Sequence, residues 1–144
     1  MLGLLYSGNL HGWDIHQFHQ RSDYQGRTLV LVRSTEGYDC AGYTSVPWTS
    51  GEQYVNDAEA FLLQLTGDLR KYQTLTPENA VLHARYAGPC FGFTLAVGAH
   101  DMGSLNGYLN GRCVTNALSN YNVGEDSQGR SVLTGSNSRD DQAR

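Results

Sequence analysis

Two histidines three residues apart are the first residues whose type and spacing could do chemistry. His16 and His19 would share one face of a helix, where their rings could hold a metal ion together. A structural zinc site needs a third and a fourth ligand, and neither His11 nor Asp23 stands at a zinc-like spacing. The pattern therefore predicts no metal site, with one histidine packed on the core and the other in solvent.

An adjacent histidine and aspartate, His100 and Asp101, could form an acid–base pair with Ser34, Ser45 or Cys90 as the nucleophile. The sequence has no Gly-x-Ser-x-Gly motif, which would place a serine on a nucleophile elbow. Asp101 is more simply a turn residue whose side chain bonds its own backbone. We therefore expect no catalytic residue and no enzyme activity.

Three cysteines, Cys40, Cys90 and Cys113, could support redox chemistry. They form no Cys-x-x-Cys pair, which argues against a zinc knuckle or a thioredoxin-like site, and unpaired thiols fit a reducing compartment. Cys90 is the candidate redox thiol, although a sensor thiol needs exposure and a lowered pKa, and only Arg85 supplies positive charge nearby in sequence. The surrounding residues 88–92 lack the lysine of a phosphate loop, so we predict no cofactor.

A four-residue turn, Ser34, Thr35, Glu36 and Gly37, is the candidate partner-binding site. Glycine at its end can adopt a positive φ without a Cβ clash. Charged residues at a turn tip are usually only solvated, but exposed loops on a rigid scaffold also carry recognition. The turn is therefore the candidate for contact with a protein partner, and the alternative is a solvated turn without a function.

The turn needs two strands to position it, and the sequence supplies them on either side. Thr28–Val32 is a β-branched and aliphatic run, which predicts a strand buried on both faces. Tyr38–Ser45 predicts a second strand with two usable faces, and Trp48 is large enough to plug one end of a core. The hairpin should lie at the centre of the fold, with buried residues that include Leu29, Leu31 and Tyr43.

Further elements follow from periodicity and turn residues. Asp14 is the expected N-cap of a helix whose apolar face carries Ile15, Phe18 and His19. Asp57 and Glu59 are expected to cap a helical turn over residues 54–59. The remaining expectations are a short strand over 2–7, a polar loop over 67–76, a surface loop over 105–111, and strands over 80–84, 91–97, 113–118 and 131–134.

Composition limits the functional class. The chain has 144 residues, of which 40% are hydrophobic and 17% charged, so it should be one globular domain. Seventeen glycines against three prolines suit the many tight turns of an all-β fold. The net charge of −4 argues against a sequence-independent grip on nucleic-acid phosphates.

The hydropathy pattern bears on location. No apolar run approaches the about 18 residues that a membrane helix needs. The apolar start lacks the basic region and cleavage site of a signal peptide. We therefore expect a soluble, cytoplasmic protein without membrane insertion.

Five segments stand in a fixed order along the chain: LLYSGNLHGWDIHQFHQRSDYQGRTLVLVRSTEG, AGYTSVPW, AFLLQLTG, YAGPCFG and VLTGS. This ordered series resembles the TLDc domain, the module of the eukaryotic oxidation-resistance proteins. The resemblance implies a mainly β fold, an antiparallel β-sandwich with a few short flanking helices. It also favours a strand over 61–66, with Phe61, Leu63 and Leu65 on one face, where local propensity favours a helix.

The family also gives expectations for domain limits. Residues 1–135 are expected to form a single TLDc-like domain, and residues 136–144 a polar, disordered tail. The family's closing strand, of Phe-x-Val-x-x-x-Glu-Val type, has no match in this sequence. A truncated chain, a strand supplied by a neighbour, or an open edge would each account for this, and we favour a longer native chain.

The resemblance implies a function without a catalytic site. We expect a non-enzymatic protein-interaction module linked to oxidative-stress protection and to regulation of the vacuolar proton pump, which is the expected partner together with larger assemblies. One alternative is a structural component held in a larger assembly by its open edge. The other is a thiol-based antioxidant in which Cys90 or Cys40 is consumed or recycled.

Overall fold

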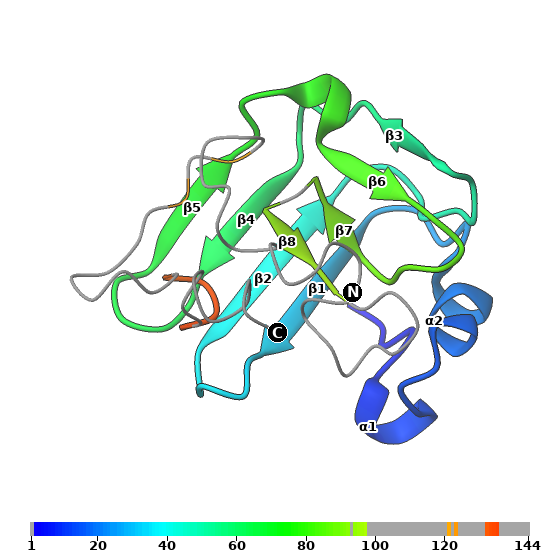
Figure 1. Cartoon of the computed structure of the whole chain (residues 1–144), viewed down its shortest axis with the longest axis horizontal. Helices are drawn as coiled ribbons and strands as arrows, with labels where there is room; N and C mark the ends of the chain where they lie inside the picture. The colour runs from blue at the N-terminus through cyan, green and yellow to red at the C-terminus, as the bar shows by residue number, and fades with distance from the viewer. Residues whose placement is uncertain (1, 93, 98–120, 122, 124–131, 136–144) are drawn as a thin grey trace, which may run out of the picture.

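Two antiparallel sheets make up the fold. The computed structural model describes residues 2–92, 94–97, 121, 123 and 132–135 (Figure 1). The first sheet has the order β1-β2-β4-β5 and the second the order β3-β6-β7-β8. Their strands are β1 (Thr28–Arg33), β2 (Asp39–Thr44), β4 (Phe61–Gln64), β5 (Arg70–Gln73), β3 (Gln53–Val55), β6 (Val81–His83), β7 (Cys90–Phe91) and β8 (Leu95–Ala96). The mainly β, antiparallel prediction is confirmed.

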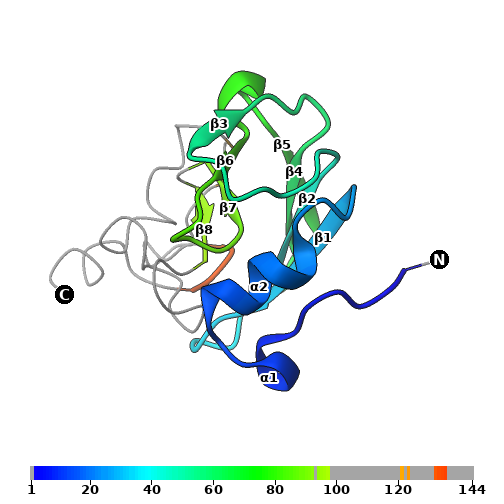
Figure 2. The ribbon, with the colours of Figure 1, turned by 90° about the vertical axis from the view of Figure 1, so that its right-hand side faces the viewer.

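Short helices accompany the sheets: α1 (Gly8–His11), α2 (Ile15–Ser22) and the 3-10 turn η1 (Pro77–Asn79). The Asp14 carboxylate accepts the His16 N–H at 2.9 Å, which confirms the predicted N-cap of α2. The helix buries Phe18 and lies at one end of the two sheets (Figure 2). None of the helices formed by the described residues has the length and apolar character needed to cross a lipid bilayer.

The core lies between the sheets and is centred on Trp48, which is 1% exposed. Its ring makes edge contacts with Phe18 and Phe91 at centroid distances of 5.9 and 5.6 Å. The indole N–H donates a 2.8 Å hydrogen bond to the Thr28 hydroxyl, so the polar end of the side chain is satisfied. The prediction that Trp48 belongs to the core is confirmed.

The first sheet differs from the prediction at β1. Leu29 and Leu31 are 42% and 70% exposed, whereas Val30 and Val32 pack against the core. The prediction of a strand buried on both faces, with Leu29 and Leu31 inside, is wrong because β1 is an edge strand with one solvated face. Tyr43, also predicted to be buried, is only half-buried on that outer face.

The inner face of β2 allows the two sheets to approach closely. Gly42 faces the second sheet, and a Cβ at this position would overlap the Phe91 ring. Glycine therefore stands where backbone and aromatic ring meet, rather than in a turn. Thr44, on the same face, is fully buried.

Between residues 53 and 97, the structure confirms some of the predicted strands and corrects others. β4 confirms the strand predicted over 61–66, although its core-facing residues are Leu62 and Gln64. The polar loop predicted over 67–76 contains β5, in which Tyr72 is partly buried against the core. The strand predicted over 91–97 is instead two short strands, β7 and β8, joined by a turn in which Gly92 has a φ of 58°.

Three further predictions fail within the described residues. Residues 2–7 form no strand, and Leu2 and Leu4 are exposed. No helical turn forms over 54–59, so Asp57 and Glu59 cap no helix. Residues 132–134 form a turn rather than a strand.

Several predictions concern residues outside the described part of the chain. These are the pair His100 and Asp101, the thiol Cys113, the loop over 105–111, the strand over 113–118 and the tail over 136–144.

Candidate partner-binding site

The hairpin between β1 and β2 ends in a closed turn. The Ser34 N–H donates to the Tyr38 carbonyl at 2.8 Å, and the Gly37 N–H donates to the Ser34 carbonyl at 3.0 Å. Gly37 adopts a φ of 83°, which favours glycine, as the turn pattern predicts. Thr35, Glu36 and Gly37 are exposed, so we call these three residues the hairpin tip.

Ser34 anchors the hairpin tip instead of joining its exposed surface. Its side chain is buried, where its hydroxyl donates to the Thr134 carbonyl at 2.6 Å and accepts the Tyr38 N–H at 3.2 Å. Three of the four residues predicted to bind a partner are thus accessible, and Ser34 holds them in place.

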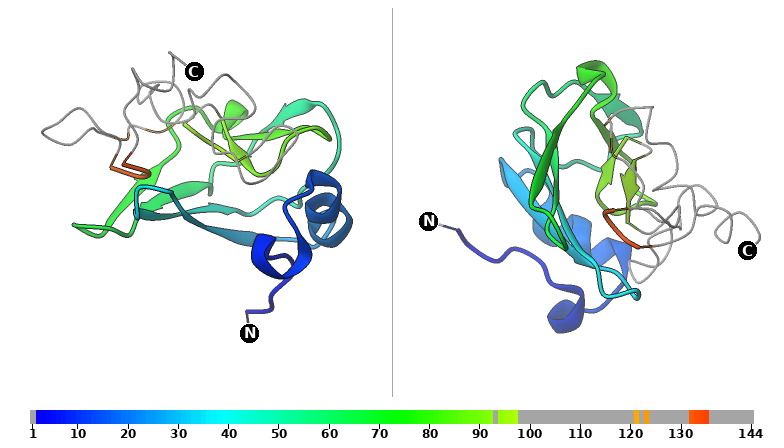
Figure 3. Two further views of the ribbon diagram at one scale, coloured as in Figure 1. Left: turned by 60° about the horizontal axis from the view of Figure 1, so that its bottom comes forward. Right: turned by 90° about the vertical axis from the view of Figure 1, so that its left-hand side faces the viewer.

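The turn over residues 132–135 packs against the hairpin tip (Figure 3). Gly135 has a φ of 71°, and a Cβ there would lie 2.7 Å from the Tyr38 ring and 3.1 Å from the Glu36 Cβ. Leu133, in the same turn, is fully buried in the core. The tip therefore rests on a second, distant segment of the chain.

The neighbouring hairpin, between β4 and β5, supports the base of the tip. The Asp39 N–H donates to the Thr66 hydroxyl at 2.7 Å, and the Asp39 carbonyl accepts the Leu65 N–H at 3.1 Å. A bidentate hydrogen bond from Arg33 lowers the pKa of Asp39, so this carboxylate already has a partner. Glu36, in contrast, enters no ion pair with any described residue.

The two histidines considered for metal binding lie in different environments. The His16 side chain is 85% exposed and contacts Asp14 at 3.1 Å, whereas the His19 side chain is buried. Groups of three or more histidine, cysteine or acidic residues that could hold a metal ion do not occur among the described residues. The geometry of this pair gives no support to a shared metal ion.

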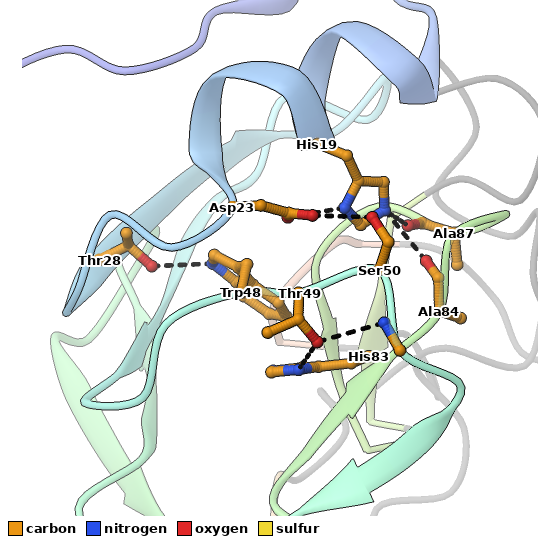
Figure 4. Close-up of polar contacts among 10 residues, drawn as sticks. His19, Asp23, Thr28, Trp48, Thr49, Ser50, His83, Ala84 and Ala87 are labelled. Carbon is orange, nitrogen blue, oxygen red and sulfur yellow. Dashed lines mark hydrogen bonds and ion pairs between the residues drawn. The ribbon is translucent and has the colours of Figure 1, made fainter.

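His19 joins α2 to the turn between β6 and β7 (Figure 4). Its Nδ1 lies 2.8 Å from the Asp23 carboxylate, and its Nε2 lies 3.0 and 2.8 Å from the carbonyl oxygens of Ala84 and Ala87. The two carbonyls can only accept, so Nε2 carries a proton. Asp23 also accepts the Ser50 hydroxyl at 2.7 Å.

This histidine–aspartate–serine group has the residue types of a catalytic triad but another connectivity. In a triad, the serine contacts the histidine nitrogen remote from the aspartate. Here Ser50 bonds the aspartate, and two backbone carbonyls occupy the remote nitrogen of His19. The group is built to fasten a helix to a sheet, and it presents no base to a nucleophile.

Comparison with models of known protein families matches residues 1–132 to the TLDc domain. The chain belongs to the TLDc domain family. A search among curated proteins finds no match. The match spans both sheets, α2 and the hairpin tip, so the family assignment covers the whole described fold apart from residues 133–135.

The candidate redox thiol lies inside this TLDc domain. Cys90, on β7, and Cys40, on β2, are both fully buried. A reactive sensor thiol needs solvent access, which neither side chain has in the folded state. The position of Cys90 therefore favours a packing role.

A second buried histidine of the TLDc domain, His83, went unnoticed in the sequence. Its Nδ1 contacts the Thr49 hydroxyl at 2.9 Å, its ring centroid lies 5.5 Å from that of Trp48, and its Nε2 has no hydrogen-bond partner (Figure 4). Burial lowers the pKa of His83, which favours the neutral ring. An isolated histidine in a short strand carries no spacing signal that could have revealed this environment.

Sequence reasoning also missed what holds the tip and the end of β2. Asp57 is buried, and its carboxylate accepts the Thr44 and Ser45 hydroxyls at 2.7 and 2.6 Å. Thr134 accepts the Ser34 hydroxyl through its backbone carbonyl, which no residue pattern reports. The four-residue separation of His19 and Asp23 was the one available signal, because such residues face each other on a helix.

Proposed function

We propose that this TLDc domain is a non-enzymatic protein-interaction module that contacts its partner through the hairpin tip. The observation that carries the proposal is the anchoring of the tip. Ser34 is bonded to Thr134 in the interior, while Thr35 and Glu36 face solvent on the far side of the same turn. A preorganised loop loses little conformational freedom on binding.

The charge of the tip supports recognition of a basic site. Glu36 projects from the anchored turn and is not neutralised by any described cation. An exposed carboxylate at a protein interface chiefly affects the association rate and the choice of partner. We propose a partner with a basic or hydrogen-bonding recess that receives the turn.

The family resemblance supplies the biological setting of the proposal. It associates such domains with oxidative-stress protection and regulation of the vacuolar proton pump in eukaryotic cytoplasm. We extend these associations to the present chain, with the pump or a larger assembly as partner. The occupied Nε2 of His19 and the buried thiols support a role without catalysis.

Binding of the purified chain to the vacuolar proton pump tests this proposal. We expect Glu36→Lys to weaken binding by about tenfold or more, in the range of a charge reversal at an interface. Glu59→Lys is the matched control, because Glu59 is an exposed carboxylate outside the tip. Equal affinities of both variants and the unchanged chain would remove the tip from the interface.

The alternative of a thiol-based antioxidant makes a separate prediction. It requires peroxide consumption that depends on Cys90 or Cys40, although both lie in the core. If the domain is an interaction module, we expect no catalytic turnover of peroxide and no change in peroxide consumption in Cys90→Ser. Turnover that is lost in this variant would favour the antioxidant.

A further inference from the structure

The outer edge of β1 pairs with no strand in the part of the chain that the structure describes. β1 stands last in the first sheet and, among the described strands, pairs with β2 alone (Figure 1). No backbone hydrogen bond joins the other side of Thr28–Arg33 to any described segment. Such an edge leaves a row of N–H and carbonyl groups for an additional strand.

The side chains along this edge are apolar on its solvent-facing side. Leu29 and Leu31 are 42% and 70% exposed, and they continue outward from the stacked pair of Tyr43 and Phe61, whose ring centroids are 4.8 Å apart. Natural edge strands usually carry charges that block pairing. Here the two central outward positions are leucines, which a paired strand would cover.

Arginines flank the two leucines on the same alternating side of the chain. Arg27, directly before β1, is exposed and forms no ion pair with a described residue. Arg33, at the other end, already holds Asp39 in a bidentate contact. Along the edge, the outward positions are therefore an arginine without an ion pair among the described residues, two leucines, and an arginine that is neutralised by Asp39.

This order disfavours a second copy of the chain as the occupant. Antiparallel pairing that sets Leu29 against the other copy's Leu31 also sets Arg27 against Arg33. Pairing Leu31 with itself sets Leu29 against Arg33, and pairing Leu29 with itself sets Leu31 against Arg27. The first register sets two arginines against each other, which destabilises a sheet, and the other two set a leucine against an arginine, so a favourable cross-strand pair is lost.

We propose that the β1 edge binds an extended segment of a different protein, paired antiparallel and carrying the pattern apolar-x-apolar-x-acidic. Its apolar residues lie opposite Leu31 and Leu29, and its carboxylate lies opposite Arg27. The antiparallel direction follows from the solvated outer face, since parallel sheets are normally covered on both faces. Main-chain hydrogen bonds supply affinity, and the side-chain pattern supplies specificity.

This surface is separate from the hairpin tip, so the inference does not depend on the proposed role of Glu36. The probe is a labelled, end-capped peptide, Thr-Val-Thr-Val-Thr-Glu-Thr, titrated with the full chain in a fluorescence anisotropy measurement. We expect saturable binding that is lost when alternate peptide nitrogens are methylated, because methylation removes the donors of the ladder. Replacing the peptide's glutamate by lysine should also weaken binding.

Variants of the chain test whether the peptide binds at the β1 edge. Leu31→Lys should weaken binding about threefold or more, as the loss of a favourable cross-strand pair requires. Leu69→Lys is the matched control, because Leu69 is 75% exposed but lies outside β1. Arg27→Glu should reverse the preference between the glutamate and lysine peptides. Glu36→Lys should leave peptide binding unchanged.

Three results would overturn the inference. One is the absence of peptide binding, and another is equal binding to Leu31→Lys and Leu69→Lys. The third is a dimer in sedimentation that Leu31→Lys abolishes, since it would assign the edge to a second copy. The peptide variants need no change in the chain, so they test the inference even if Leu31→Lys does not fold.

Discussion

Burial acts in opposite directions on two titratable side chains of this domain. Around His83, burial penalises the charged ring and lowers its pKa. At Asp57, burial would raise the pKa, but hydrogen bonds from Ser45 and Thr44 outweigh it and the net pKa is lowered. The histidine is thus held neutral, whereas the carboxylate is held charged.

The two residues predict different pH ranges for loss of stability. Because the folded-state pKa of His83 lies below 6.5, the unfolded chain binds a proton at this residue first. The contribution of His83 is complete above about pH 6.5 and falls as the pH drops toward the folded pKa. Asp57 contributes above its ordinary pKa of 3.8, and this contribution is lost only as the pH falls through its lower folded value.

Urea unfolding of the unchanged chain and of His83→Gln at pH 8, 7, 6 and 5 measures the first effect. We expect the free energy of unfolding of the unchanged chain to fall more between pH 7 and 5 than that of His83→Gln. Parallel pH profiles would show that His83 titrates alike in the folded and unfolded chains. Asp57 should not contribute to the difference, since its transition lies at lower pH.

Among the elements, the hairpin tip and the turn over 132–135 depend on each other. Ser34→Ala removes the donor to the buried Thr134 carbonyl and the acceptor for the Tyr38 N–H. Leaving a buried polar group without a partner costs about 1–3 kcal/mol. We expect Ser34→Ala to lower the free energy of unfolding by this amount and to speed amide hydrogen exchange at Gly37 and Tyr38.

Thr35→Ala is the control for this element, because Thr35 lies in the same turn with its side chain exposed. It should leave both the unfolding free energy and the exchange rates nearly unchanged. Equal effects of the two substitutions would mean that the Ser34 hydroxyl does not anchor the tip.

Local sequence patterns predicted the elements that depend on contacts between neighbouring residues. Asp14 predicted the start of α2, and Gly37 predicted the turn between β1 and β2, because both residues act through neighbouring backbone groups. β1 was misread because an aliphatic run cannot distinguish a covered strand from an edge strand. β5 was missed because its residues are mostly polar, with Tyr72 alone of the four partly buried.

For the whole molecule, contacts between distant segments set the limits of sequence reasoning. The residue types of the turn predicted that the hairpin tip is exposed, but they did not predict the hydrogen bond between Ser34 and Thr134. The contacts of His19 with the carbonyls of Ala84 and Ala87 were likewise not predictable from the sequence. Backbone acceptors are available at any residue, so no side-chain pattern marks the ones that a fold uses.

The enclosed thiols give a prediction for the whole fold. In a Cys113→Ser background, Cys40 and Cys90 should react with a thiol reagent only through opening of the sandwich. We expect native labelling to be slower than labelling in denaturant by more than about 10³-fold, given the usual stability of a domain. Fast native labelling of Cys90 would show that β7 opens locally, and it would restore a sensor role.

The hydrogen bond between Ser34 and Thr134 also bears on when the domain matures. It joins residues separated by 100 positions, so it closes a loop that spans most of the sheets. During synthesis the β1–β2 hairpin leaves the ribosome long before Thr134 does, at about 5–20 residues per second. The hairpin can pair early, but its tip gains its buried anchor only after this late segment has been made. A nascent chain therefore carries the hairpin tip for several seconds before the tip can hold its final shape.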